Sequence, residues 1–195
     1  MLWMHIVPPA ALQTAPVATL PIEALLKTLN GIPQAYIEGE SGKIPGILNQ
    51  TRAQWEQSKK DIAIAIPGHE VELINLSLNN MGALKPRDQA ELALEVSAHL
   101  ITHVSPTRET QVLGAASKTM LAWCRVDAGR WSEIPNVAEA FKPVVDEDQG
   151  RHLIAVKDIQ VALDQLQVDL EQKSAPNAKK TLKRLLDLVA MLEKP

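Results

Sequence analysis

The amino-acid sequence predicts an α+β fold, in which a small mixed or antiparallel sheet packs against helices and a C-terminal amphipathic helical hairpin follows. Isoleucines alternate with alanines over 61–66, and a second alternating run over 71–78 follows the Pro67-Gly68 turn, which indicates a β-hairpin. Two amphipathic stretches, 158–172 and 178–194, flank a turn at 174–177 and predict the pair of helices. We therefore expect an α/β domain over 1–150 and a helical appendage over 151–195 that can pack on the same core.

The remaining segments complete this prediction. Further strands are expected at 2–7, 34–38, 110–115 and 153–156, where short apolar runs end at turn residues. Helices are expected at 21–29, 47–60, 86–104 and 118–128, where apolar residues recur at helical spacing. Asn30-Gly31 is expected to end the first of these, and Gly129 to cap the last in a left-handed conformation. The segment 134–145 fits either a helix or a strand.

Composition limits the classes of function. The chain has 195 residues, of which 46% are hydrophobic and 22% charged, which is ordinary for a globular protein. With a net charge of −3 and scattered basic residues, the chain has no extended basic segment of the kind that binds nucleic acid. No run of about 18 apolar residues predicts a membrane-spanning helix, and residues 1–7 lack the features of a signal peptide. The single cysteine, Cys124, cannot form an internal disulfide, so we expect a cytoplasmic protein.

Two groups of polar residues could hold a metal ion. Glu95, His99 and His103 are four residues apart on the predicted helix 86–104, so one carboxylate and two imidazoles would share a face. The same residues would also serve as the solvated face of that helix. The acidic segment 146–150 lacks the spacing of an EF-hand. These residues allow a small metal- or nucleotide-dependent enzyme as an alternative function.

Other catalytic and cofactor signals are missing from the sequence. No phosphate-binding glycine motif occurs, and we expect no bound cofactor. Cys124 follows Leu121, Ala122 and Trp123 in the middle of a predicted helix, away from the helix N-terminus that would activate a thiol. We expect it to be buried as a small apolar residue. A non-enzymatic function is therefore favoured over an enzymatic one.

The C-terminal helix is the main candidate for partner binding. It carries an apolar stripe and, opposite the stripe, a group of basic residues that is compatible with an acidic protein or a membrane surface. Binding of another protein or self-association, and packing within the chain, are equally open for the stripe. The candidate partner-binding residues are Leu182, Leu185, Leu186, Val189, Leu192, Lys179, Lys180, Lys183 and Arg184.

The order of these elements resembles a known module. The run Ile62–Val71, a second strand ending at Leu76-Ser-Leu78 and a helix with Gln89, Glu91 and Glu95 form the first half of the match. The segments 112–116, 120–123 and 134–140 form the second half. Over residues 60–141 the chain is similar to the actin-like module of PilM and GspL, bacterial cytoplasmic components that assemble type IV pili and type II secretion systems. The resemblance implies a non-enzymatic assembly or adaptor module, because the family's nucleotide-binding motifs have no counterpart here.

Overall fold

The described part of the chain is entirely helical. The computed structural model describes residues 19–104, 106–148 and 153–192, and no β-strand occurs among them. The predicted α+β fold class is therefore wrong, and the resemblance to the PilM and GspL module is wrong too, because an actin-like fold needs a β-sheet core. The predicted strand 2–7 lies outside the described residues. The helices are α1 (Thr19–Ile37), α2 (Ile44–Ala65), α3 (Gly68–Met81), α4 (Pro86–Thr102), α5 (Arg108–Asp127), α6 (Val137–Asp148), α7 (Leu153–Glu171) and α8 (Ala175–Leu192), with 3₁₀ turns at Ser41–Lys43 and Trp131–Glu133.

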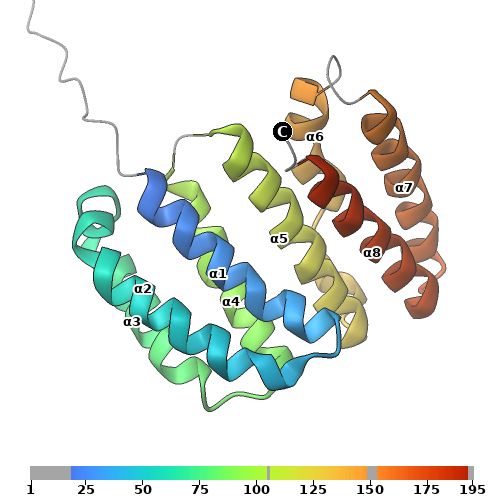
Figure 1. Ribbon diagram of the computed structural model, residues 1–195. Helices are drawn as coiled ribbons and strands as arrows, with labels where there is room; N and C mark the ends of the chain where they lie inside the picture. The colour runs from blue at the N-terminus through green and yellow to red at the C-terminus, as the bar shows by residue number, and fades with distance from the viewer. Residues whose placement is uncertain (1–18, 105, 149–152, 193–195) are drawn as a thin grey trace, which may run out of the picture.

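The helices form two rings of four that meet along α5 (Figure 1). In the first ring α1 contacts α2 and α4, and α3 contacts the same two helices. In the second ring α5 contacts α6 and α8, and α7 contacts the same two helices. Because α5 also packs against α1 and α4, it belongs to the second ring and forms the junction with the first.

The predicted β-hairpin lies in α2 and α3. In α2, Ile62 is buried together with Ser58 one turn earlier, whereas Ile64 is 87% exposed. Ile66, the extended residue that follows the end of α2, is buried as well. The isoleucines at every second position therefore do not share one face, as they would in a strand. In α3 the buried residues are Ile74, Leu78 and Met81, again at helical spacing.

The predicted strand 34–38 is the end of α1, which continues through Gly31 and Pro33. Glycine and proline inside a helix cost about 1 and 3 kcal/mol in intrinsic propensity. The apolar face of α1 outweighs this cost because it is buried from end to end. Its buried apolar residues are Ile22, Leu25, Leu26, Leu29, Ile32 and Ala35.

The two remaining strand predictions are also wrong, because both segments lie in helices. Residues 110–115 lie in the first half of α5, which begins at a capping box in which Thr107 and Thr110 each bond the backbone N–H of the other. Residues 153–156 are the first turn of α7.

Several predicted features are confirmed: α1, α2, α4 and α5 include the predicted helices, α7 and α8 are the C-terminal pair, and Gly129 has φ +69°. The ambiguous segment 134–145 contributes most of α6.

Each ring encloses its own apolar core. The first core includes Trp55, whose side chain is 1% exposed, together with residues from α1 to α4. The second core surrounds Phe141, which is fully buried, and draws residues from α5, α6, α7 and α8. The helical pair α7 and α8 thus packs on the same core as α5 and α6. Within the described residues, no helix is both long enough and apolar enough to cross a bilayer.

Close packing around α5 depends on its small buried side chains. Ala115 and Ala122 are fully buried in the second core, and Ser117 and Cys124 are buried on other sides of the helix. Small residues allow neighbouring helices to approach on several sides at once.

We expect Ala122→Leu to lower the free energy of unfolding by about 1–3 kcal/mol, because three added carbons would have to enter a filled core. Chemical denaturation with urea measures this difference. Ala98→Leu, at an exposed position in the middle of α4, is the matched control and should change stability by less than about 0.5 kcal/mol. Equal effects of the two substitutions would show that α5 is not tightly enclosed.

Candidate binding groove

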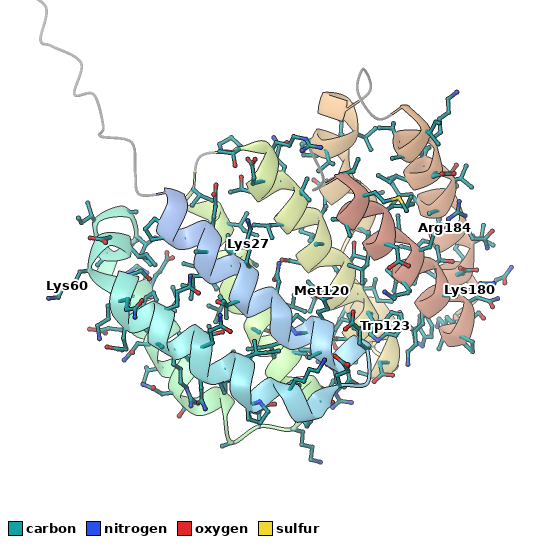
Figure 2. All side chains as sticks on the ribbon, viewed as in Figure 1. Lys27, Lys60, Met120, Trp123, Lys180 and Arg184 are labelled. Carbon is teal, nitrogen blue, oxygen red and sulfur yellow. The ribbon has the colours of Figure 1, made fainter. Side chains whose placement is uncertain are left out.

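Residues of α1 and α8 form the walls of a groove and residues of α5 form its floor. Figure 1 shows α5 between the two other helices. The groove contains a cavity of about 340 Å³, and a second cavity of about 210 Å³ shares Lys27 and Leu113 with the first. Figure 2 labels Lys27 on α1 and Met120 on α5, which both line the main cavity. The apolar surface comes mainly from Leu113, Ala116, Met120, Leu186 and Val189, and the polar surface from Lys27, Asn30, Gln34, Glu38, Lys183 and Asp187.

Asn30 is the most unusual residue of the groove. Its side chain lines the cavity, yet the residue is only 7% exposed. Ser117 of α5 and Ser97 of α4 donate hydrogen bonds to Asn30 Oδ1 at 3.0 and 3.4 Å. The Nδ2 group has no hydrogen-bond partner among the described residues. A buried polar group without a partner costs about 1–3 kcal/mol. Because Nδ2 itself has less than 1 Å² of accessible surface, the amide would reach a molecule in the groove only after its side chain turns towards the cavity.

The Ser97 and Ser117 hydroxyls do not need Asn30 as a hydrogen-bond acceptor. Each hydroxyl also lies within hydrogen-bond distance of the carbonyl four residues earlier, Ser97 with Ala93 at 2.9 Å and Ser117 with Leu113 at 2.8 Å. Each serine can therefore donate its proton within its own helix. Asn30 contributes a polar site to the groove and is not essential to satisfy its neighbours.

A polar network connects the three groove helices at one end. Tyr36 of α1 and Lys179 of α8 both donate to the Asp127 carboxylate of α5. Lys179 Nζ also lies 5.6 Å from the ring centre of Trp123, within the range of a cation–π interaction. The network therefore helps to fix the separation between the two walls of the groove.

This network shifts two ionisation equilibria. Partial burial of the Asp127 carboxyl favours a higher pKa, but hydrogen bonds from Lys179 and Tyr36 outweigh it and hold the pKa below its usual value. Burial, and then the hydrogen bond to Asp127, raise the pKa of Tyr36. At neutral pH the carboxylate is therefore charged and the phenol is protonated, which is the combination that this network requires.

A second ionic network holds the floor of the groove against the first ring. Glu91 of α4 contacts Arg130 and lies 3.3 Å from Arg125 of α5, and the Glu91 and Arg125 side chains are 11% and 13% exposed. Glu133 accepts from Arg125 at 2.9 Å. Removing one charged side chain of this nearly buried network would leave the opposite charges of its partners unpaired. The network therefore holds α4 and α5 in register.

The candidate partner-binding residues of α8 lie in several environments. Leu182, Leu185 and Leu192 are fully buried in the second core, so they are not accessible in the single chain. Lys183, Leu186 and Val189 line the groove. Lys180 and Arg184, labelled in Figure 2, line a shallow cavity of about 400 Å³ beside α7, and Lys179 belongs to the polar network.

The predicted metal ligands do not converge. Glu95 and His99 line a cavity of about 120 Å³ between α3 and α4, whereas His103 pairs with Glu70 at 2.6 Å. Glu95 also lies 3.7 Å from Arg125. No group of three or more His, Cys, Asp or Glu side chains in the described ranges could hold a metal ion. The metal site stays a prediction, and residues 149–150 of the acidic segment lie outside the described residues.

Cys124 has the predicted environment. It is fully buried in the middle of α5. Burial raises the pKa of its thiol to about 12, with smaller contributions from the Glu91 and Asp127 charges. The prediction that Cys124 is buried is confirmed, and a thiol whose pKa is raised in this way is a poor nucleophile at neutral pH.

The comparisons with known proteins give no relative. No family model matches the chain, and neither a curated protein nor a solved structure matches it. The groove is therefore interpreted from its own chemistry.

The groove residues of α1 and α5, including Lys27, Asn30 and Met120, are absent from the candidate site residues predicted from the sequence. Asn30 was expected only to stop the first helix together with Gly31. The available signal is its position beside Leu26 and Leu29, on the apolar side of a helix that continues past it. A polar residue on such a face indicates either a buried network or a binding site.

If the Asn30 amide serves a ligand, Asn30→Leu should leave stability unchanged or raise it by up to about 1 kcal/mol, since an apolar side chain replaces a poorly satisfied polar one. The control is Asn75→Leu, which removes the acceptor 3.3 Å from the buried Trp55 indole N–H. We expect that control to lose about 1–2 kcal/mol. Urea unfolding compares the variants, and a loss above about 2 kcal/mol in Asn30→Leu would assign the amide a structural role.

The Asp127 network should make stability depend on pH. Because the folded-state pKa of Asp127 is lowered, its stabilisation is present above the unfolded-state value and is lost as pH falls through the folded-state value. We expect Asp127→Asn to be less stable than the parent protein at about pH 7, by less than about 1 kcal/mol, and the difference to shrink towards about pH 3. Asp61→Asn, at an exposed site on α2, should show no such dependence in urea unfolding. A deficit of Asp127→Asn that is the same at both pH values would contradict the network.

Proposed function

We propose that this protein is a non-enzymatic adaptor that binds a segment of another protein in the groove between α1, α5 and α8. The observation that carries the proposal is the open groove itself, in which apolar side chains of α5 lie between polar residues of α1 and α8. A polypeptide carries apolar side chains and supplies a carbonyl acceptor at every residue, to which the Asn30 amide would donate once its side chain turns towards the cavity.

The shape of the groove favours a polypeptide over a compact ligand. From Lys27 to Ile37, α1 rises about 15 Å along the groove, which matches about four or five residues of extended chain. The groove is open, and the second cavity lengthens it beyond Lys27 towards Arg108 and Glu109. An open groove of this length suits a chain segment that continues past the Arg108 end, whereas the Tyr36–Asp127–Lys179 network links the walls at the other end.

The lining suits a segment with alternating apolar and polar side chains. The floor offers Leu113, Ala116 and Met120 to apolar groups, and Lys27 and Glu38 place charges of both signs at the rim. Lys183 pairs with Asp187 at 2.8 Å on the α8 wall. Because the rim carries no dominant charge, apolar contact and the Asn30 hydrogen bond would supply most of the affinity.

We further propose a reducing, cytoplasmic setting for this interaction. The buried thiol of Cys124 is compatible with that setting, since nothing in its surroundings prepares it for disulfide exchange.

A displayed random peptide library tests the proposal on the full chain. We expect selected peptides to bind with micromolar affinity and Ala190→Trp to weaken them at least about tenfold, because Ala190 is an exposed groove residue and an indole there would occupy the groove. The matched control is Ala63→Trp, at an exposed site on α2, which should leave binding unchanged. Circular dichroism confirms that both variants are folded.

Two results would overturn this function. A library that yields no binder above background would show that the groove does not accept peptides. Peptides that bind the parent and Ala190→Trp equally would place the binding surface elsewhere.

A further inference from the structure

The outer face of α7 carries apolar side chains that no described part of the chain covers. Ile154, Val161 and Val168 are 79%, 55% and 43% exposed. The opposite face of the same helix is buried in the second core through Ile159, Ala162 and Leu166. In Figure 1 α7 lies at the edge of the molecule, and it contributes no residue to the α1/α5/α8 groove.

The spacing of these residues is regular. Each is seven residues from the next, and seven residues fall about 20° short of two helical turns. The three side chains therefore form one stripe with a slow left-handed drift, as on a helix that pairs with another helix. A helix–helix seam has two apolar positions in each heptad, and this stripe supplies one of them, with polar residues at the positions between.

We propose that a second copy of this chain covers the stripe, with the two α7 helices antiparallel about a twofold axis at Val161. Val161 would then contact Val161 of the second copy, and Ile154 would contact Val168 of the second copy, twice by symmetry. This interface is separate from the peptide groove and does not depend on the function proposed for it.

Charge complementarity supports this arrangement. Lys157 and Asp164 are both exposed and lie on the same flank of the stripe. In a symmetric antiparallel pair like flanks meet, so Lys157 would face Asp164 of the second copy, and the reverse pair would form as well. In a parallel pair this flank would face Asp158 and Gln165 instead, and Asp158 already pairs with Arg184 of α8 at 3.4 Å.

A single helix pair is a small interface, so we expect a weak dimer that forms only at high protein concentration. Sedimentation velocity of the full chain, over a concentration series up to about 1 mM, measures it. The dissociation constant should rise at least about fivefold for Lys157→Asp, which places like charges together at both ends of the seam. It should return to within about twofold of the parent value when Asp164→Lys is added.

The matched control is Lys60→Asp, an exposed site on α2 that Figure 2 shows far from α7. It makes the same charge change and should leave the dissociation constant unchanged. Cysteine cross-linking then tests the register: Val161→Cys should cross-link to itself, whereas Ile154→Cys should do so only when combined with Val168→Cys. The native Cys124 is buried and gives little background.

Each other outcome decides against the proposal. A chain that remains monomeric at the highest concentration would show that the stripe is not a self-association surface. A dimer unaffected by Lys157→Asp would place the interface elsewhere. Self-cross-linking of Ile154→Cys alone would show that the helices pair in parallel.

Discussion

The structure depends on the enclosure of α5 by other helices on several sides. This helix packs against α1 and α4 in one ring and against α6 and α8 in the other, and this is possible because its buried residues include Ala115, Ser117, Ala122 and Cys124. Helices approach closely where side chains are small, and in a closely packed core the position of one helix fixes the positions of its neighbours. The two rings are therefore held together through one shared helix and the Glu91 ionic network beside it.

The groove is a consequence of the same constraint. Both α1 and α8 rest on α5, and the surface between them forms its floor. The Tyr36–Asp127–Lys179 network links the walls at one end, while Asn30 places a poorly satisfied amide in the α1 wall. Proteins retain such groups where they serve binding at some expense of stability. The combination of linked walls and an apolar floor is what supports a binding function.

The sequence revealed the helices better than it revealed the fold. Helical spacing around Leu25, Trp55 and Leu182 was long enough to be unambiguous, so these elements were predicted correctly. Short runs failed: the isoleucines at 62, 64 and 66 alternate as in a strand, yet Ile62 and Ile64 lie on different sides of α2, and in 71–78 Ile74 and Leu78 are buried at helical spacing. At the site, Leu186 was predicted to bind a partner. Asn30 was not predicted, because its environment depends on Ser97 of α4 and Ser117 of α5, which lie far from it in the sequence.

The most direct test of the central claim is a ¹⁵N–¹H NMR titration of the full chain with a peptide selected for binding. We expect the side-chain amide signals of Asn30 to shift together with backbone signals of Lys27, Met120 and Leu186, and hydrogen exchange of that amide to slow once a carbonyl accepts its proton. Shifts that avoid Asn30, or an amide that exchanges at the same rate in the free and bound states, would contradict the account.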